Sequence, residues 1–316
     1  MDKLMAQQRH LHDRALGAYL GLAVGDALGA TVEFMLPREI RYQYGVHKDI
    51  IGGGWLRLKA GRVTDDTEMS LALGRALIAS GGWNANAVAD SYVDWLKSRP
   101  VDIGNTCRRG IQRYILNGSL SSLASEGDAG NGAAMRNLPL VLLTLNDEQA
   151  FVELTLAQSH FTHNHPLSDA ATLALGRMLR QMFREGKIKE CREVVKSLVS
   201  EHPKFQFTPY PGRASGYIVD TMQTVLHHLF ITDSFESLVV ETINCGEDAD
   251  TTGAIAGMLG GALYGVGAIP ARWLDKLEQH VVSEIRQQVN KLLDLAEHSC
   301  HPPIHNDQTS PSRVSI

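Results

Sequence analysis

Apolar residues recur every three or four positions along almost the whole chain, and this spacing constrains the fold more than any other feature. The repeat is clear at Val88, Tyr92 and Leu96, and again at Met222, Val225, Leu226 and Leu229. Residues at this spacing share one face of a helix, whereas a half-buried strand needs apolar residues at every second position. Sustained alternation of the second kind is hard to find. We therefore predict an all-α fold, a compact domain of many helices.

Glycine and proline mark where the predicted helices begin and end. Gly118 and Gly186 each follow a helical pattern, in the place of a helix C-cap. Pro166 suits the first position of a helix. Two glycine-rich stretches, residues 51–66 and 125–137, each lead into a helical pattern. Because loops that precede helix N-termini are candidate site loops, we expect functional residues in both stretches.

Length and composition predict one folded domain with short extensions. Hydrophobic residues make up 44% and charged residues 21% of the 316 residues, as in ordinary globular proteins. No linker-like composition interrupts residues 12–297, which we take as the domain after an N-terminal extension at 1–11. Residues 298–316 turn polar and proline-rich and are expected to be disordered. The longest uncharged run, residues 251–271, nearly reaches the length of a membrane span, but its many Gly and Ala residues and Pro270 favour a buried helix.

Charge and cysteine content argue against several classes of protein. The formal net charge is -5, without the clustered basic face that nucleic-acid binding requires. The four cysteines are scattered and show no zinc-type spacing, which favours a reducing compartment. The N-terminus carries charges through its first turns and lacks the order of a signal peptide. We therefore expect a cytoplasmic protein that does not bind nucleic acid.

Two short segments place acids and threonines directly before a predicted helix. The first is Thr64, Asp65 and Asp66, and the second is Asp248, Asp250 and Thr251. One explanation is helix capping, for which Asp65 and Glu68 have a spacing like that of a capping box. Capping needs one acid at each helix, however, and neighbouring carboxylates repel unless water or a shared cation screens them. Carboxylate and hydroxyl oxygens suit Mg²⁺ or Mn²⁺ rather than Zn²⁺, and the spacing alone leaves both explanations open.

Several other polar residues allow both a structural and a functional interpretation. Glu33 lies near the end of a small-residue helical pattern and gains importance only beside a metal centre. Residues 125–137 could present backbone N–H groups to a diphosphate or form a plain turn. The three histidines of "SHFTHNHPLSDA" lack the frame of a zinc site. Asp102 precedes a predicted helix, where it could cap that helix or act as an acid or base.

Taken in order, six segments of the chain resemble the motifs of the ADP-ribosylglycohydrolase family. They are "GAYLGLAVGDALGATVEF", "VTDDTEMSLALGRAL", "VDIGNTCRRG", "EGDAGNGAAMRN", "THNHPLSDAATLALG" and "GEDADTTGAIAGMLGGALYG". The resemblance covers residues 12–297. It implies an all-α fold with a binuclear Mn²⁺ or Mg²⁺ centre at helix termini, and hydrolysis of the N-glycosidic bond between ADP-ribose and a protein side chain. In particular, the chain resembles the bacterial branch that acts on an arginine of dinitrogenase reductase and so regulates nitrogen fixation.

The resemblance also implies roles for individual residues. The metal ligands would be Glu33, Thr64, Asp65, Asp66, Asp248, Asp250 and Thr251, with Asp250 as the bridge. Asp102 and Glu126 would be catalytic, Asp102 by shuttling a proton and Glu126 by holding, with Asn105, the sugar or the departing guanidine. The other substrate contacts would be Gly127, Gly130 and Gly132 at the diphosphate, and His163 and Tyr217 at the nucleotide.

One position departs from the family pattern. Glu247 stands where this branch is expected to have glycine, which puts the local backbone in doubt, and we assign it no ligand role.

The resemblance implies binding partners, and the sequence also allows two other functions. The partners would be ADP-ribosylated dinitrogenase reductase as the substrate, and a PII-type signalling protein that can hold the enzyme at an ammonium transporter, in peripheral association with the membrane. We expect a monomer. The chain could instead hydrolyse another ADP-ribosyl linkage, to serine or to a small molecule, or bind ADP-ribose without turnover.

Overall fold

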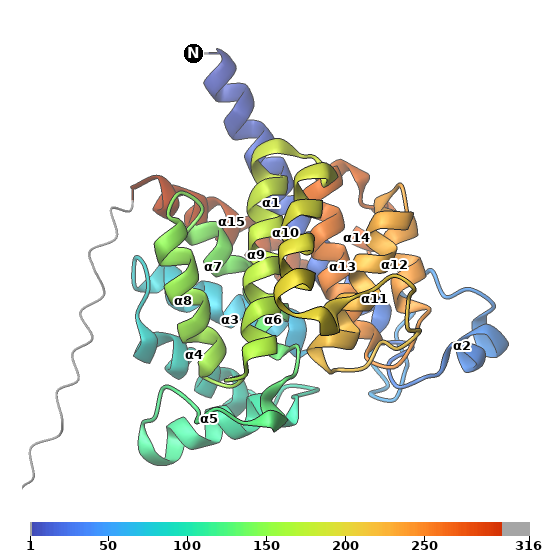
Figure 1. Ribbon diagram of the computed structural model, residues 1–316, viewed down its shortest axis with the longest axis horizontal. Helices are drawn as coiled ribbons and strands as arrows, with labels where there is room; N and C mark the ends of the chain where they lie inside the picture. Colours follow the sequence, from blue (N-terminus) through green and yellow to red (C-terminus); the bar gives the residue numbers. More distant parts are fainter. Residues whose placement is uncertain (1, 299–316) are drawn as a thin grey trace, which may run out of the picture.

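The computed structural model describes residues 2–298 of the chain, which form helices and loops without a β-strand in that range (Figure 1). The α-helices are α1 (Asp2–Gly29), α2 (Pro37–Tyr44), α3 (Asp65–Ala79), α4 (Ala85–Lys97), α5 (Asn105–Asn117), α6 (Gly132–Met135), α7 (Leu138–Leu143), α8 (Glu148–His160), α9 (Pro166–Glu185), α10 (Ile188–Glu201), α11 (Ile218–Ile231), α12 (Phe235–Ile243), α13 (Ala249–Tyr264), α14 (Ala271–Leu274) and α15 (Gln279–His298). Three short 3₁₀ helices are η1 (Glu126–Asp128), η2 (Pro203–Phe205) and η3 (Val266–Ala268). The predicted all-α fold is confirmed.

Two helices far apart in the sequence, α1 and α13, pack against each other in the middle of the molecule (Figure 1). Gly21 faces Gly257 and Gly25 faces Gly253, so the helices run antiparallel. A β-carbon on any of these four glycines would collide with the carbonyl oxygen of the opposite residue. Glycine every fourth residue therefore allows the two backbones to touch. This contact brings the C-terminal end of α1 beside the N-terminal end of α13.

The long uncharged run of the sequence is the centre of the core. Every residue from Ala249 to Leu263 of α13 is buried, and the helix ends at Tyr264, before Pro270. Among the described residues, no helix is both long and apolar enough to cross a membrane. The interpretation of this run as a buried helix is therefore confirmed.

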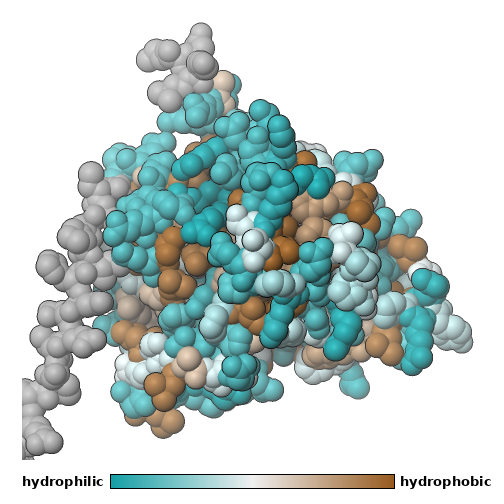
Figure 2. All heavy atoms as spheres, viewed as in Figure 1, coloured by the Kyte–Doolittle hydropathy of each residue, from teal (hydrophilic) through white to brown (hydrophobic). Residues whose placement is uncertain are grey.

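The remaining helices surround this central pair. Helix α3 contacts α4, α7 and α15, while α9 contacts α1, α13 and α10. In Figure 1, α9 and α10 lie in front, and α2 stands at the right edge, away from the bundle. On the same face, Figure 2 shows a largely hydrophilic surface with apolar residues in separate patches. The core thus gathers around α1 and α13, and the ends of these helices reach the surface where the site forms.

The predicted helix ends agree with the structure. Gly118 and Gly186 cap α5 and α9 in the left-handed conformation, and Pro166 is the first residue of α9. Helix α1 is continuous from Asp2, so no break in secondary structure marks the proposed boundary after residue 11. Helix α15 ends at His298, and the rest of the predicted disordered tail lies outside the described residues.

Candidate active site

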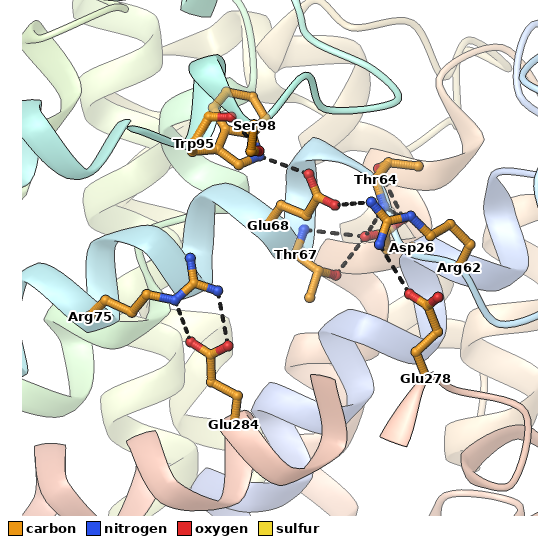
Figure 3. A network of polar contacts seen from close by, with 10 residues as sticks. All are labelled: Asp26, Arg62, Thr64, Thr67, Glu68, Arg75, Trp95, Ser98, Glu278 and Glu284. Atoms are coloured by element: carbon orange, nitrogen blue, oxygen red, sulfur yellow. Dashed lines mark hydrogen bonds and ion pairs between the residues drawn. The ribbon is translucent and has the colours of Figure 1, made fainter. Parts of the chain in front are cut away.

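The N-terminus of α3 is capped by a residue of another helix. The buried carboxylate of Asp26, in α1, accepts hydrogen bonds from the backbone N–H groups of Thr64 and Thr67 at 3.0 and 3.2 Å (Figure 3). It also accepts from the hydroxyls of the same two threonines, at 2.9 and 2.5 Å. Asp26 thus accepts from the N-cap residue and from the third residue of α3, where a capping side chain acts, so the acids of that turn are not needed for this cap.

The capping box suggested by the sequence does not form. Glu68 instead accepts hydrogen bonds from the guanidinium of Arg62, at 2.5 Å, and from the indole N–H of Trp95, at 2.7 Å (Figure 3). At the other acidic segment, Asp248 is the N-cap residue of α13, but its side chain makes no capping hydrogen bond. Oδ1 of Asp250 accepts from the backbone N–H of Thr251 at 2.9 Å, so one acid serves the first turn of α13, but helix capping does not account for the others.

These acids converge from three segments of the chain. The carboxylates of Glu33, Asp248 and Asp250 each place one oxygen within 4.8 Å of the other two. The hydroxyl of Thr251 donates to Oδ2 of Asp66 at 3.2 Å and so joins the first turn of α13 to that of α3. The packing of α1 on α13 thus turns two distant sequence motifs into one cluster.

Burial and mutual repulsion disfavour the charged forms of this cluster. Burial raises the pKa of Glu33 to about 8, that of Asp65 to about 7 and that of Asp248 to about 6. It raises the pKa of Asp66 and of Asp250 well above the usual range of a carboxyl, and neighbouring acids push in the same direction. The protein alone supplies too little positive charge to keep all five carboxylates ionised.

A divalent cation fits this donor set. All the donors are oxygen atoms, as Mg²⁺ and Mn²⁺ prefer. Oδ1 of Asp66 is buried without a hydrogen-bond partner among the described residues, which is costly unless a ligand satisfies it. A cation would also offset the repulsion between the carboxylates. The cluster can therefore hold metal.

A cavity of about 810 Å³ opens over the acidic cluster. This volume lies within the ~300–1,000 Å³ typical of small-molecule sites. Its polar and charged lining comprises Glu33, Asp65, Asp102, Asn105, Thr106, Arg108, Asn131, His163, Arg213, Ser215, Glu247, Asp248, Asp250 and Thr251. Six of the predicted site residues that have carboxylate or amide side chains are thus found around one space.

The loop before α5 brings Asp102 and Asn105 to this cavity. The backbone N–H of Gly104 donates to Oδ2 of Asp65 at 3.0 Å, which ties the loop to α3. Gly104 is the N-cap residue of α5, and Asp102 accepts only from the N–H of Ile103, at 2.7 Å, so Asp102 does not cap the helix. Burial raises the pKa of the half-buried Asp102, which suits a group that holds and releases a proton.

His163 forms the opposite wall with two of the predicted glycines. Gly130, Gly132 and His163 all line the cavity. A β-carbon on Gly132 would lie 2.7 Å from Cε1 of His163, so the ring fits because residue 132 is glycine. Burial lowers the pKa of His163 well below its usual value, and the imidazole is therefore neutral near pH 7.

Five predicted site residues do not line the cavity, and two of them, Thr64 and Asp66, belong to the acidic cluster. Glu126 and Gly127 lie exposed in η1, and Glu126 has its carboxylate 3.5 Å from Nε2 of His165. Tyr217 pairs through its backbone with Gly130, at the edge of the cavity wall. The structure therefore gathers most of the predicted site but leaves Glu126, Gly127 and Tyr217 at its periphery.

Two polar groups that hold the acids were not singled out in the sequence. The indole N–H of Trp55 donates to Oε2 of Glu33 at 2.6 Å, and the amide of Asn131 donates to Oδ2 of Asp248 at 2.5 Å. Both lie in the glycine-rich stretches 51–66 and 125–137. Composition thus identified the two stretches as candidate site loops. It did not identify Trp55 and Asn131 as hydrogen-bond donors, because the carboxylates that accept from them lie far away in the sequence.

Glu247 adopts the backbone conformation of a glycine, with φ of 53°. Its N–H donates to the carbonyl of Met35 at 2.8 Å, and its carbonyl accepts from the N–H of Phe34 at 2.6 Å. Its carboxylate accepts from the N–H of Ala214 at 3.1 Å. The backbone of Glu247 thus holds the segment of Phe34, and its side chain holds the segment of Ala214.

Several known proteins are similar to this chain in sequence and fold. A family model described as ADP-ribosylglycohydrolase matches residues 7–302. The chain is similar to the ADP-ribosyl-[dinitrogen reductase] glycohydrolase of Rhodospirillum rubrum, with 60% identity over 90% of this chain and 97% of the relative. It is also similar to the ADP-ribosylarginine hydrolase Tri1 of Serratia proteamaculans, with 32% identity over 88% of this chain and 79% of the relative. A solved structure titled "ADP-ribosylglycohydrolase-related protein complex" has a TM-score of 0.82 at 32% identity, over 91% of this chain and 99% of that chain.

Proposed function

The chain belongs to the ADP-ribosylglycohydrolase family, and on this premise we propose that it is a metal-dependent hydrolase that removes ADP-ribose from an arginine of dinitrogenase reductase and so reactivates it. The relative with that activity in its name is 60% identical, and the name of a second relative specifies the arginine linkage. One structural observation carries the proposal. Asp26 caps α3 and the side chain of Asp248 makes no capping hydrogen bond at α13, so carboxylate oxygens at both helix ends are left for a cation.

The proposed metal ligands come from the ends of α1, α3 and α13. They are Glu33, Thr64, Asp65, Asp66, Asp248, Asp250 and Thr251, around two Mn²⁺ or Mg²⁺ ions bridged by Asp250. The bound ions would supply Lewis acidity and a template for the ribose hydroxyls. Trp55 and Asn131 would orient the carboxylates of Glu33 and Asp248 through their hydrogen bonds.

Asp102 is proposed to move the proton. The bond between the anomeric carbon of the ribose and a guanidinium nitrogen breaks, and that nitrogen receives a proton, so that the arginine leaves as a guanidinium. The carboxyl of Asp102 would donate it, which its raised pKa favours. The oxygen of a water molecule then joins the anomeric carbon, and a proton of that water returns to Asp102.

The remaining proposed residues bind substrate. Asn105 and Glu126 would hold the sugar or the departing guanidine, Glu126 from the exposed rim. The backbone at Gly127, Gly130 and Gly132 would bind the diphosphate, and His163 and Tyr217 would contact the nucleotide. A neutral His163 can accept or donate one hydrogen bond without adding charge beside the ligand.

The test is release of ADP-ribose from arginine-ADP-ribosylated dinitrogenase reductase with Mn²⁺, with Mg²⁺ and with EDTA, beside a peptide that carries ADP-ribosyl-serine. We expect release from the arginine substrate that is abolished by EDTA and by Asp250→Ala. Release from the serine peptide alone would replace the proposal by hydrolysis of another linkage. Tight ADP-ribose binding without release from either substrate would make the chain a non-catalytic binding protein.

We also propose that a PII-type protein regulates the chain and can hold it at an ammonium transporter, in peripheral association with the membrane. This part rests on the resemblance to the nitrogen-fixation branch. Co-purification of the chain with its PII protein from membranes of ammonium-treated cells tests it. Equal recovery from membranes that lack the transporter would contradict the transporter as anchor.

A further inference from the structure

Exposed apolar side chains are concentrated on the segment between α1 and α3, which contributes two of them to the cavity lining. Among the described residues, six of the twelve exposed large apolar residues belong to this one segment. They are Phe34, Leu36, Tyr42, Val46, Ile51 and Trp55, which we call the collar. The rings of Phe34 and Trp55 line the cavity and lie 5.2 Å apart, centre to centre. The collar is thus continuous with the cavity wall.

The collar is poorly explained by packing within the chain. Tyr42 lies on α2, which stands at the edge of the molecule in Figure 1, and 94% of its surface is exposed. Phe34 and Trp55 are 64% and 51% exposed. Clustered exposed aromatic residues mark binding surfaces, and Trp, Tyr and Arg are the residues that most often dominate the energy of protein interfaces.

The same segment is basic although the chain is acidic overall. Five exposed basic side chains make no ion pair with any residue in the described range, and they are Arg38, Arg41, Lys48, Arg57 and Lys59. The two exposed acids of the segment are both engaged, since Asp49 pairs with Arg272 at 3.2 Å and Glu39 accepts from the N–H of Leu36 at 2.8 Å. The collar therefore presents positive charge and aromatic surface together, next to an acidic cavity.

We propose that the collar and its basic side chains form the docking surface for the polypeptide that carries the ADP-ribosyl group, and that they bind an acidic, partly apolar face around the modified arginine. This inference rests on the proposed function. A modified side chain that enters the cavity brings its own polypeptide against the cavity mouth. A specific interface covers about 800 Å² on each partner, so it must extend beyond the mouth onto the collar.

The test compares one reaction on two substrates. Tyr42→Ala and Arg41→Glu change residues that do not line the cavity. For arginine-ADP-ribosylated dinitrogenase reductase, each variant should raise KM about tenfold or more, because both residues belong to the proposed interface. For free ADP-ribosyl-arginine, kcat and KM should both stay at the wild-type values. Higher salt should raise the wild-type KM for the protein substrate alone.

Ile231→Ala provides the matched control. Ile231 is 59% exposed at the C-terminal end of α11, a helix of 14 residues and so about 20 Å from the end that carries Tyr217. This variant should leave both substrates unaffected. Unchanged KM for the protein substrate in Tyr42→Ala and Arg41→Glu, or equal losses on both substrates, would overturn the docking surface. Failure of the wild-type chain to cleave either substrate would instead refute the proposed function, and the docking proposal with it.

Discussion

Two buried carboxylates, Asp26 and Asp66, share Thr64 as a neighbour but have opposite surroundings. Asp26 accepts from two backbone N–H groups and two hydroxyls, and its pKa is raised by burial to about 6. Asp66 receives only the hydroxyls of Thr64 and Thr251, at 3.4 and 3.2 Å, and its Oδ1 has no partner among the described residues. Its pKa is raised further, well above the usual value. A buried carboxylate whose oxygens accept several hydrogen bonds stabilises the fold. A buried carboxylate that lacks donors and lies beside other acids is suited to bind a cation.

The isosteric change Asp66→Asn should have the largest effect, and it tests whether Asp66 binds metal rather than stabilises the fold. We expect at least about a 1,000-fold loss of kcat/KM, because bound metal contributes several kcal/mol of transition-state stabilisation. The metal-free protein should keep its stability, since a buried carboxylate with unsatisfied oxygen is removed. Steady-state kinetics and urea unfolding in EDTA measure the two effects. Lost stability without lost metal binding would show that Asp66 is structural.

The matched change Asp26→Asn should have the opposite profile. The new amide keeps one acceptor oxygen, but its NH₂ group in place of Oδ2 would face the N–H and the hydroxyl of Thr67, which both lose their acceptor. We expect the free energy of unfolding to fall by about 2 kcal/mol, at ~1 kcal/mol for each lost bond. Urea unfolding in EDTA again provides the measurement. A variant as stable as the wild type would refute the role of Asp26 as the cap of α3.

Glu247 is an intermediate case between Asp26 and Asp66, because its carboxylate has one identified hydrogen-bond donor, the N–H of Ala214. Glu247→Gln keeps an acceptor oxygen and should leave KM within about twofold of the wild type. Glu247→Gly removes the acceptor and should raise KM for ADP-ribosyl-arginine about tenfold, as expected for one hydrogen bond to a charged group.

The change to glycine adds no backbone strain that could affect the comparison of the two variants, since glycine readily adopts the φ of 53° at this position. Hydrogen exchange gives an independent measurement. The amide of Ala214 should exchange faster in Glu247→Gly and at the wild-type rate in Glu247→Gln. Faster exchange in both variants would mean that the charge, and not the hydrogen bond, holds this wall.

The smallest expected effect is the pH dependence of the metal-free protein. In the folded protein the pKa of Asp65 is about 7 and that of Glu33 is about 8. Near neutral pH these two groups therefore hold protons that the unfolded chain has already lost. The folded state therefore binds more protons, and stability falls as pH rises. Between pH 6.5 and 8 we expect a loss on the order of 1 kcal/mol in EDTA.

Thermal unfolding at the two pH values, with EDTA and with excess Mg²⁺, checks this sign. Added metal should reverse the trend, because ionised carboxylates bind the cation more tightly. Stability that rises with pH in EDTA would contradict the raised pKa values.

Much of the architecture could be predicted because it is encoded locally. Apolar spacing predicted helices, and Gly118, Gly186 and Pro166 marked helix ends that the structure confirms. Individual contacts across the site were harder to predict. Trp55 lies 22 residues from Glu33, and Asn131 lies 117 residues from Asp248, so no local pattern links the members of either pair.

The sequence by itself determined the helical fold, the glycine-rich runs and the two acidic segments, because periodicity, backbone freedom and charge are properties of neighbouring residues. It could not decide between capping and metal binding for those acids. Only the tertiary structure decided that capping does not explain them, since the capping carboxylate of Asp26 comes from α1, 38 residues before Thr64. The physical reason is that a buried N–H group takes whichever acceptor the packing brings near, and the close contact of α1 with α13 sets which carboxylates are satisfied and which are left for a cation.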